Sequence, residues 1–205
     1  MEIFKYLTGP IQVNTYLAFD ESKKGFIVDP GGYDSSLTRK AKAENVDIQY
    51  IILTHGHGDH IGGVEDFIKE FPMAKIVAYK EEKEMLESPS LNVSAELFGR
   101  DITVKADIFV SDNETLTVGN TQLTFIHTPG HTKGGMSIVT DGYVFSGDTL
   151  FQASIGRTDF YGGDFNEIIK SIKERLFALP DDTMVLPGHM GETTIKYEKE
   201  HNPFV

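Results

Sequence analysis

The stretch THGHGDHIGG, residues 54–63, holds three of the seven histidines of this 205-residue chain and places an aspartate among them. It continues from IQYIILT (residues 48–54), a nearly continuous apolar run that is typical of a strand buried on both faces. Beyond the motif, apolar residues recur at three- and four-residue spacing from Ile61 to Phe71, which predicts an amphipathic helix. The histidines are therefore expected in a short loop at the carboxyl end of a buried strand.

The composition of this loop allows several side chains to converge on one point. His55 and His57 are two residues apart, so in extended backbone they point the same way. The glycines between them add no bulk and permit unusual dihedral angles. Asp59 and His60 lie where the next helix begins and reach the same point from another side. Four metal-binding side chains from one loop make a strong signal for so short a motif.

Three further residues occupy the same kind of position, each beside a glycine and just past a predicted strand or strand-ending turn: His131, Asp148 and His189. Ligands of open α/β sheets gather at the carboxyl ends of strands, so we expect one site built from four loops. Five histidines and two carboxylates without a thiolate suit Zn, Fe or Mn. Seven ligands exceed the needs of one tetrahedral ion. Two divalent ions, with zinc as the first choice, are predicted, with a water between them activated for hydrolysis.

The rest of the chain alternates predicted strands and helices. Further strands are expected over 13–20, 24–32, 74–79, 115–118, 121–127, 136–140, 143–147 and 183–189, with helices over 35–45 and 164–179. Residues 87–107 show no clean period and are expected to form a long loop with a short helix, a kind of segment that often covers a site. No linker or charge block divides the chain. We therefore expect a single α/β domain over residues 1–205, with two sheets and outer helices.

The segment DFNEIIKSIKERLFAL (residues 164–179) carries the strongest helix signal. Asp164 is placed as the N-cap, and Glu167 three residues later predicts a capping box. The spacing of its apolar residues predicts a buried stripe made of Phe165, Ile168, Ile169, Ile172 and Leu176.

The composition excludes several classes of function. A net charge of -12 and a pI of about 4.9 argue against nucleic acid and anionic membranes as partners. The absence of cysteine excludes disulfides and thiolate ligands or nucleophiles. No signal peptide is evident, and no apolar run approaches the roughly 18 residues of a membrane span. We expect a cytoplasmic monomer or homodimer that acts on a small molecule.

Seven motifs resemble, in order, the glyoxalase II-like (hydroxyacylglutathione hydrolase-like) branch of the metallo-β-lactamase superfamily: GPIQVNTYL, VDPGG, THGHGDHIGG, HTPGHTKGG, FSGDTLF, IGRTD and PGHMGETTIKYEKEHNPF. The resemblance runs from Ile3 to Phe204. It implies a four-layer αββα sandwich, in which helices flank two mixed β-sheets and the site lies at one rim.

The resemblance also implies a role for each candidate residue. His55, His57 and His131 would hold one metal, Asp59, His60 and His189 would hold the second, and Asp148 would bridge the two. Asp59 would act in catalysis as well, by handling protons of the nucleophilic water. Asp29 in VDPGG would stand behind the ligands and orient their loop.

The sequence departs from the resemblance in two places. Full-length glyoxalase II proteins carry a helical C-terminal region that grips glutathione, whereas only residues 190–205 follow His189 here, so the short single-domain members match better. The usual GHTPGG motif reads GHTKGG, which puts Lys133 near His131, either to meet an anionic substrate or to point into solvent. Arg157 either pairs with Asp159 or binds a substrate carboxylate through two parallel N–H···O hydrogen bonds.

The ligand residues predict a dinuclear metal-dependent hydrolase. The resemblance implies that it is a thioesterase, which acts on hydroxyacylglutathione-type thioesters through a metal-bridging hydroxide. GRTDF (residues 156–160) also resembles persulfide dioxygenases of the same fold, whose single Fe(II) would be held by His55, His131 and Asp148. A lactonase-type hydrolase and a non-catalytic metal-binding protein are further alternatives. The absence of cysteine excludes a β-lactamase of the cysteine-ligand type.

Overall fold

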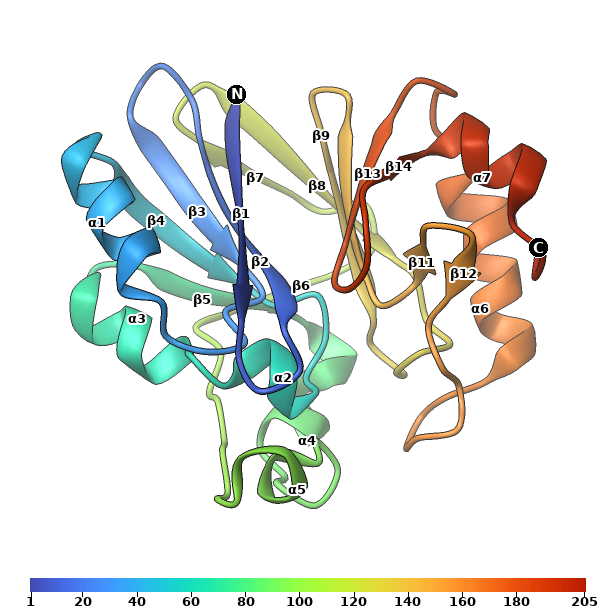
Figure 1. The fold of residues 1–205 in the computed structure, drawn as a ribbon, viewed down its shortest axis with the longest axis horizontal. Helices are drawn as coiled ribbons and strands as arrows, with labels where there is room; N and C mark the ends of the chain where they lie inside the picture. The colour runs from blue at the N-terminus through green and yellow to red at the C-terminus, as the bar shows by residue number, and fades with distance from the viewer.

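The computed structural model describes residues 1–205 and shows two six-stranded sheets packed face to face between outer helices (Figure 1). The first sheet has the order β1-β2-β3-β4-β5-β6 and the second the order β14-β13-β10-β9-β8-β7. Both sheets contain parallel and antiparallel neighbours. The expected four-layer αββα sandwich of two mixed sheets is therefore confirmed.

The two sheets come from successive halves of the chain. The strands of the first sheet are β1 (Glu2–Thr8), β2 (Val13–Phe19), β3 (Lys24–Val28), β4 (Asp47–Ile52), β5 (Lys75–Tyr79) and β6 (Ile108–Val110). Those of the second are β7 (Thr115–Val118), β8 (Thr121–His127), β9 (Met136–Thr140), β10 (Tyr143–Gly147), β13 (Met184–Pro187) and β14 (Thr193–Thr194). A small hairpin, β11 (Leu150–Phe151) and β12 (Ser154–Ile155), stands apart from both sheets.

The helices cover the outer faces and one rim of the sandwich. α1 (Ser35–Ala43) and α3 (Val64–Glu70) lie outside the first sheet, and α6 (Phe165–Ser171) and α7 (Ile195–His201) lie outside the second (Figure 1). The short helices α2 (Gly58–Ile61), α4 (Lys83–Leu86) and α5 (Ser94–Phe98) lie toward the lower rim in that view. No helix combines the length and the apolar character needed to cross a membrane.

Alternation along the central strands explains the layers. Successive side chains of a strand point to opposite faces. Tyr16 of β2 therefore packs between the sheets, where its ring meets Phe145 edge-on at 5.3 Å between centroids, while Leu17 packs outward with the helices. Every residue of β2 is buried. A strand covered on both faces is largely apolar, and its buried polar residues, Asn14 and Thr15, donate to backbone carbonyls. Burial of the apolar residues is the main favourable contribution to folding.

Helix α6 begins as the sequence predicts, with differences. The Asp164 carboxylate accepts from the backbone N–H groups of Asn166 and Glu167. The predicted capping box is not completed, because the Asp164 N–H donates to the Gly130 carbonyl at 2.9 Å instead. Phe165 is 53 % exposed, so its assignment to the buried stripe was wrong. The helix continues past α6 as a π-helical segment over Ile172–Leu176. The fully buried positions Ile168, Ile172 and Leu176 repeat every four residues, a series that includes Asp164 and not Phe165.

The irregular region 87–107 contains the expected short helix, α5, and a loop held by one side chain. Buried Asn92 donates to the carbonyls of Met85 and Ile102 and so joins the two ends of the loop. The strand β6, which follows directly, was not predicted. Neither were the hairpin β11–β12 and the helix α7, each of which is short or polar in sequence.

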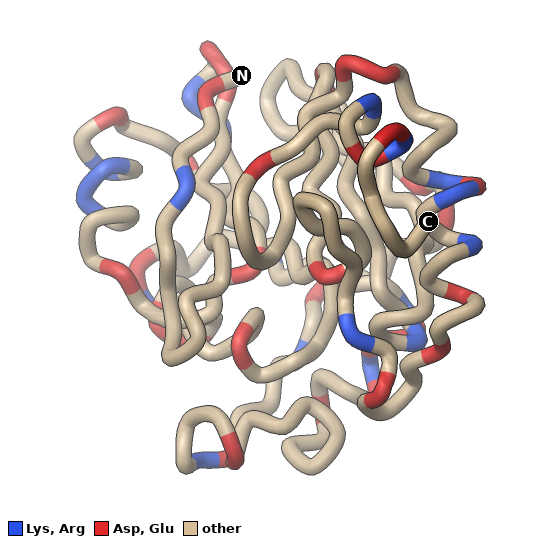
Figure 2. The backbone as a smooth tube through the Cα atoms, turned by 45° about the vertical axis from the view of Figure 1, so that its right-hand side comes forward, with Lys and Arg blue, Asp and Glu red and all other residues tan.

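Charged side chains are spread over the surface of the sandwich. Figure 2 shows Lys and Arg positions interspersed with Asp and Glu positions along the outer helices and loops. The helices also pair some of these charges internally, as in Lys40–Glu44 and Lys69–Glu65, and such exposed pairs contribute little to stability.

Candidate metal centre

The predicted ligand residues meet at one rim of the sandwich. His55, His57, Asp59 and His60 follow β4, while His131, Asp148 and His189 come from loops of the second sheet, after β8, β10 and β13. All except Asp148 and His189 are buried, and those two are only partly exposed. The site therefore forms where the ends of strands from both sheets approach each other.

Close backbone contacts explain the glycines of the HGHGDH loop. Gly58 donates its N–H to the Asn92 carbonyl at 2.7 Å, and a Cβ atom on it would lie 2.8 Å from the Cα of Ser94. A larger residue there would push α5 away from the loop. His57 takes the N-cap position of the short helix α2, which turns Asp59 and His60 back toward the site.

The first ligand group consists of three histidines. His57 Nδ1 lies 2.9 Å from His131 Nε2, which lies 3.2 Å from His55 Nε2. Nitrogen atoms at two corners of a tetrahedron around zinc would stand about 3.3 Å apart, given Zn–N bonds of about 2.0–2.1 Å. The three imidazoles thus match three corners of one tetrahedral site.

The second ligand group consists of Asp59, His60 and His189. Asp59 Oδ2 is 3.1 Å from His189 Nε2 and 3.4 Å from His60 Nε2. Asp148 lies between the two groups: its Oδ1 is 3.3 Å from His60 Nε2, and its Oδ2 is 3.6 Å from His131 Nε2. One carboxylate therefore faces members of both groups.

Two unpartnered polar atoms test whether these groups fit metal ions. His60 Nε2 and Asp148 Oδ1 are buried and have no hydrogen-bond partner. Burying a polar atom without a hydrogen-bond partner costs free energy. A cation bound between this imidazole nitrogen and this carboxylate oxygen would give both atoms a partner. The residues present therefore fit divalent metal ions, and their nitrogen and carboxylate donors suit Zn, Fe and Mn alike.

The protonation states agree with this fit. Burial, aided by neighbouring histidines, holds the pKa of His55 well below its usual value and lowers that of His57 to about 3, so both imidazoles are neutral and keep a free lone pair. Burial would also lower the pKa of His60, but the carboxylates of Asp59, Asp148 and Asp29 outweigh it and raise that pKa. The same carboxylates would favour a metal dication in place of that proton.

Hydrogen bonds behind the ligands fix which ring nitrogen faces the site. Asp29 accepts from His60 Nδ1 at 2.9 Å and from the Thr54 hydroxyl at 2.6 Å. The Thr54 oxygen in turn accepts from His55 Nδ1 at 3.1 Å, and the Arg157 carbonyl accepts from His131 Nδ1 at 2.7 Å. Each of these three histidines is therefore oriented with Nε2 toward the other ligands. Asp29 thus lies behind Thr54 and His60, within hydrogen-bond distance of both.

A cavity of about 470 Å³ opens over the ligands. His57, Asp59, His131, Asp148 and His189 lie in its wall, and half of the lining is apolar: Ile11, Val93, Leu97, Phe151, Ile155, Phe160 and Met190. Glu96 is its remaining acidic residue. Sequence reasoning did not identify these wall residues, because single apolar residues in loops give no pattern.

Arg157 and Lys133, the two predicted substrate contacts, take different positions. Arg157 lines the cavity, but its guanidinium binds the Asp159 carboxylate through two hydrogen bonds of 2.7 Å and stacks on the Phe160 ring at 3.7 Å. Lys133 is exposed and lies outside the cavity lining. Of the two, only Arg157 is placed to meet a ligand over the metal groups.

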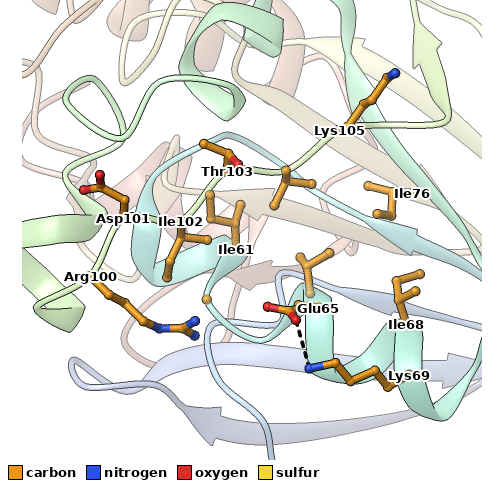
Figure 3. A pocket seen from close by; sticks show the side chains of 13 residues that line it. Ile61, Glu65, Ile68, Lys69, Ile76, Arg100, Asp101, Ile102, Thr103 and Lys105 are labelled. Atoms are coloured by element: carbon orange, nitrogen blue, oxygen red, sulfur yellow. Dashed lines mark ion pairs between the residues drawn. The ribbon is translucent and has the colours of Figure 1, made fainter.

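A second cavity, of about 420 Å³, lies on the outer side of α2 (Figure 3). Ile61, Ile68, Ile76 and Ile102 project into it, and Glu65 and Lys69 form an ion pair of 2.9 Å at its edge. It contains no histidine and no convergent set of metal-binding side chains. The cavity over the histidines is therefore the candidate active site.

Known proteins are similar to this chain in sequence and in structure. The sequence profile of the metallo-beta-lactamase superfamily matches residues 8–189. The chain is 38 % identical over 200 residues to the probable metallo-hydrolase YqgX of Bacillus subtilis, covering 96 % of this chain and 94 % of that protein. It is 34 % identical over 199 residues to the hydroxyacylglutathione hydrolase GloC of Haemophilus influenzae, covering 95 % and 93 %.

Solved structures agree with the sequence matches. The BLEG-1 B3 metallo-beta-lactamase superposes with a TM-score of 0.92 at 40 % identity, over 99 % of both chains. ETHE1 from Myxococcus xanthus superposes with a TM-score of 0.79 at 27 % identity, over 99 % of this chain and 84 % of that one. The resemblance noted from the motifs is thereby confirmed: the chain belongs to the metallo-beta-lactamase superfamily.

Proposed function

We propose that this protein is a dinuclear metal-dependent thioesterase that hydrolyses hydroxyacylglutathione-type thioesters. The observation that carries the proposal is the position of Asp148, whose two carboxylate oxygens face a member of each ligand group. The match to GloC supports the substrate class. Divalent ions held by the two groups would supply a water nucleophile of near-neutral pKa and would polarise the thioester carbonyl.

The side chains of the cavity perform the remaining steps. Water attacks the thioester carbonyl carbon, the C–S bond breaks, and the sulfur leaves as a thiolate. The Asp59 carboxylate lines the cavity and is ionised. Burial would raise its pKa, but the charge of His60 and the hydrogen bond from His189 outweigh burial and lower that pKa. It takes the proton from the water and passes it to the departing sulfur. The apolar walls bind the uncharged part of the substrate and exclude bulk water.

A panel of substrates tests this function. The protein, purified without chelator and analysed for metal content, would be assayed with S-lactoylglutathione, simple acyl thioesters, a lactone and a chromogenic β-lactam. We expect the highest kcat/KM for a thioester, at about 10⁴ M⁻¹ s⁻¹ or above. Turnover of the β-lactam alone would instead assign the activity named for BLEG-1 and reject the proposal.

A mononuclear Fe(II) persulfide dioxygenase is the second candidate. The motif GRTDF at residues 156–160 favours it, together with the close approach of His131 Nε2 to His55 Nε2 and to Asp148 Oδ2, at 3.2 and 3.6 Å. A single iron held in this way would leave the complete ligand group of Asp59, His60 and His189 without a metal ion to bind. One iron per chain and oxygen uptake with glutathione persulfide, without thioester hydrolysis, would establish it in place of the hydrolase.

A further inference from the structure

Glu82 is a buried carboxylate that the proposed reaction does not use. It ends the short 3₁₀ turn Lys80–Glu82 that follows β5, and it is 1 % exposed. No Lys or Arg pairs with it, and burial raises its pKa. Placing a carboxylate in the interior without a cation is costly, so its hydrogen bonds must account for its position.

All three hydrogen bonds of Glu82 come from the two loops that carry the three-histidine group. Its Oε2 accepts from the Gly56 N–H at 2.9 Å, and Gly56 stands between His55 and His57. Its Oε1 accepts from the Gly134 N–H at 2.8 Å and from the hydroxyl of Thr132, which follows His131. One side chain thus joins a loop of the first sheet to a loop of the second.

The fit around Glu82 is tight. A Cβ atom on Gly56 would lie 3.0 Å from its Oε2, and one on Gly134 would lie 2.5 Å from its backbone nitrogen. The two loops therefore rest directly against the glutamate. Asp29 contacts His60 of the other ligand group directly and reaches His55 only through Thr54, whereas Glu82 contacts only the loops of the three-histidine group.

We propose that Glu82 is a positioning residue that fixes the spacing between the His55–His57 loop and His131, and thereby sets the metal affinity of the three-histidine group. This inference rests on the assignment of the two metal groups in the proposed function, but not on the thioester chemistry. It predicts a defect confined to one of the two groups. A general loss of stability would affect both.

Binding titrations on metal-free protein test the inference. Asp59→Ala leaves only the three-histidine group intact, and His57→Ala leaves only the Asp59–His60–His189 group intact. Glu82→Gln would be added to each, and Zn²⁺ affinity measured by competition with a chromophoric chelator. A glutamine has one oxygen, so in either amide orientation its NH₂ faces the N–H of Gly56 or of Gly134 and one of these hydrogen bonds is lost. We expect the dissociation constant to rise about 10- to 100-fold in the Asp59→Ala background, and to change by no more than about twofold in the His57→Ala background.

Two further variants keep the test decisive. Glu198→Gln is the matched control, because Glu198 is also 1 % exposed and accepts from Ala153, Thr193 and Asn202, none of which neighbours a histidine ligand. It should destabilise the protein and leave the affinity of the three-histidine group unchanged. If Glu82→Gln fails to fold, Thr132→Val should weaken that group and Thr132→Ser should restore it. Equal losses in both backgrounds, or none in either, would overturn the inference, whether or not the protein hydrolyses thioesters.

Discussion

His57 presents Nδ1, and not Nε2, to the Nε2 atom of His131, 2.9 Å away. The other ring nitrogen of His57 is buried and has no hydrogen-bond partner, whereas His55 and His131 use their Nδ1 atoms for supporting hydrogen bonds. The Phe160 ring meets the His57 imidazole edge-on instead, at 5.5 Å between centroids. Apart from its contact with His131, this imidazole is held by packing and has no supporting hydrogen bond from behind.

Replacing Asp148 should remove metal and activity together. Asp148→Ala takes away the carboxylate that faces both ligand groups, so we expect fewer than two metal ions per chain and a fall in kcat/KM of about 100-fold or more. Elemental analysis and the thioester assay on the same preparation measure both quantities. Asp141→Ala, in the turn between β9 and β10, is the control. Full activity at normal metal content in Asp148→Ala would refute the bridging assignment.

Asp29→Asn should weaken the group that contains His60. One carboxylate oxygen of Asp29 accepts from the Thr54 N–H, and the other accepts from the Thr54 hydroxyl and His60 Nδ1. An asparagine has only one oxygen, so its NH₂ must face one of these two sets of donors. We expect a loss of about 1–3 kcal/mol in the free energy of unfolding of the metal-free protein, and a 10- to 100-fold loss of metal affinity. Urea unfolding and chelator competition measure these effects. An unchanged affinity would show that His60 needs no support.

Acid should destabilise the metal-free protein partly through His57. Its pKa is lowered by burial to about 3 in the folded chain, below the ordinary value of 6.5. The unfolded chain therefore binds a proton that the folded chain does not, and the stability contributed by neutral His57 is lost as the pH falls from about 6.5 toward 3. The unfolding free energy of the native chain should decline more steeply over this range than that of His57→Asn. Parallel curves would contradict the prediction, and the exposed His201→Asn serves as the control.

Phe160→Ala should impair substrate binding more than folding. The ring forms part of the cavity wall, contacts His57 and lies under the Arg157 guanidinium. We expect KM for the thioester to rise about tenfold, in line with the loss of one buried aromatic contact. Phe165→Ala is the matched control, because Phe165 is 53 % exposed and lies outside the cavity lining. A KM equal to that of the control would exclude Phe160 from the binding site.

The sequence predicts the parts of this molecule that depend on local pattern. The run IQYIILT could be assigned to a buried strand because it leaves no polar face, and β4 occupies most of it. The strand β6 could not be found, since three residues at a sheet edge carry no period. Phe165 was misassigned because helical spacing alone does not say which of two adjacent series faces the sheet.

The candidate site also has a part that local sequence pattern predicts and a part that it does not. The ligand residues stand in compact motifs at strand ends, so their approach to one another follows from the fold class. Glu82 lies in the run KEEKE, residues 80–84, whose composition is that of a solvated surface. Only the tertiary structure shows that this one carboxylate turns inward to the Gly56 and Gly134 loops.

Each ligand group draws residues from both sheets, and this has a consequence for assembly. The first sheet uses only residues up to Val110 and the second only residues from Thr115 onward. A metal ion in either group would therefore be a non-covalent cross-link between the two halves of the chain, and its binding energy would add to the energy that docks them. Chains cut between Val110 and Thr115 should reassociate in proportion to free metal, so that a split form of this protein would work as a metal sensor.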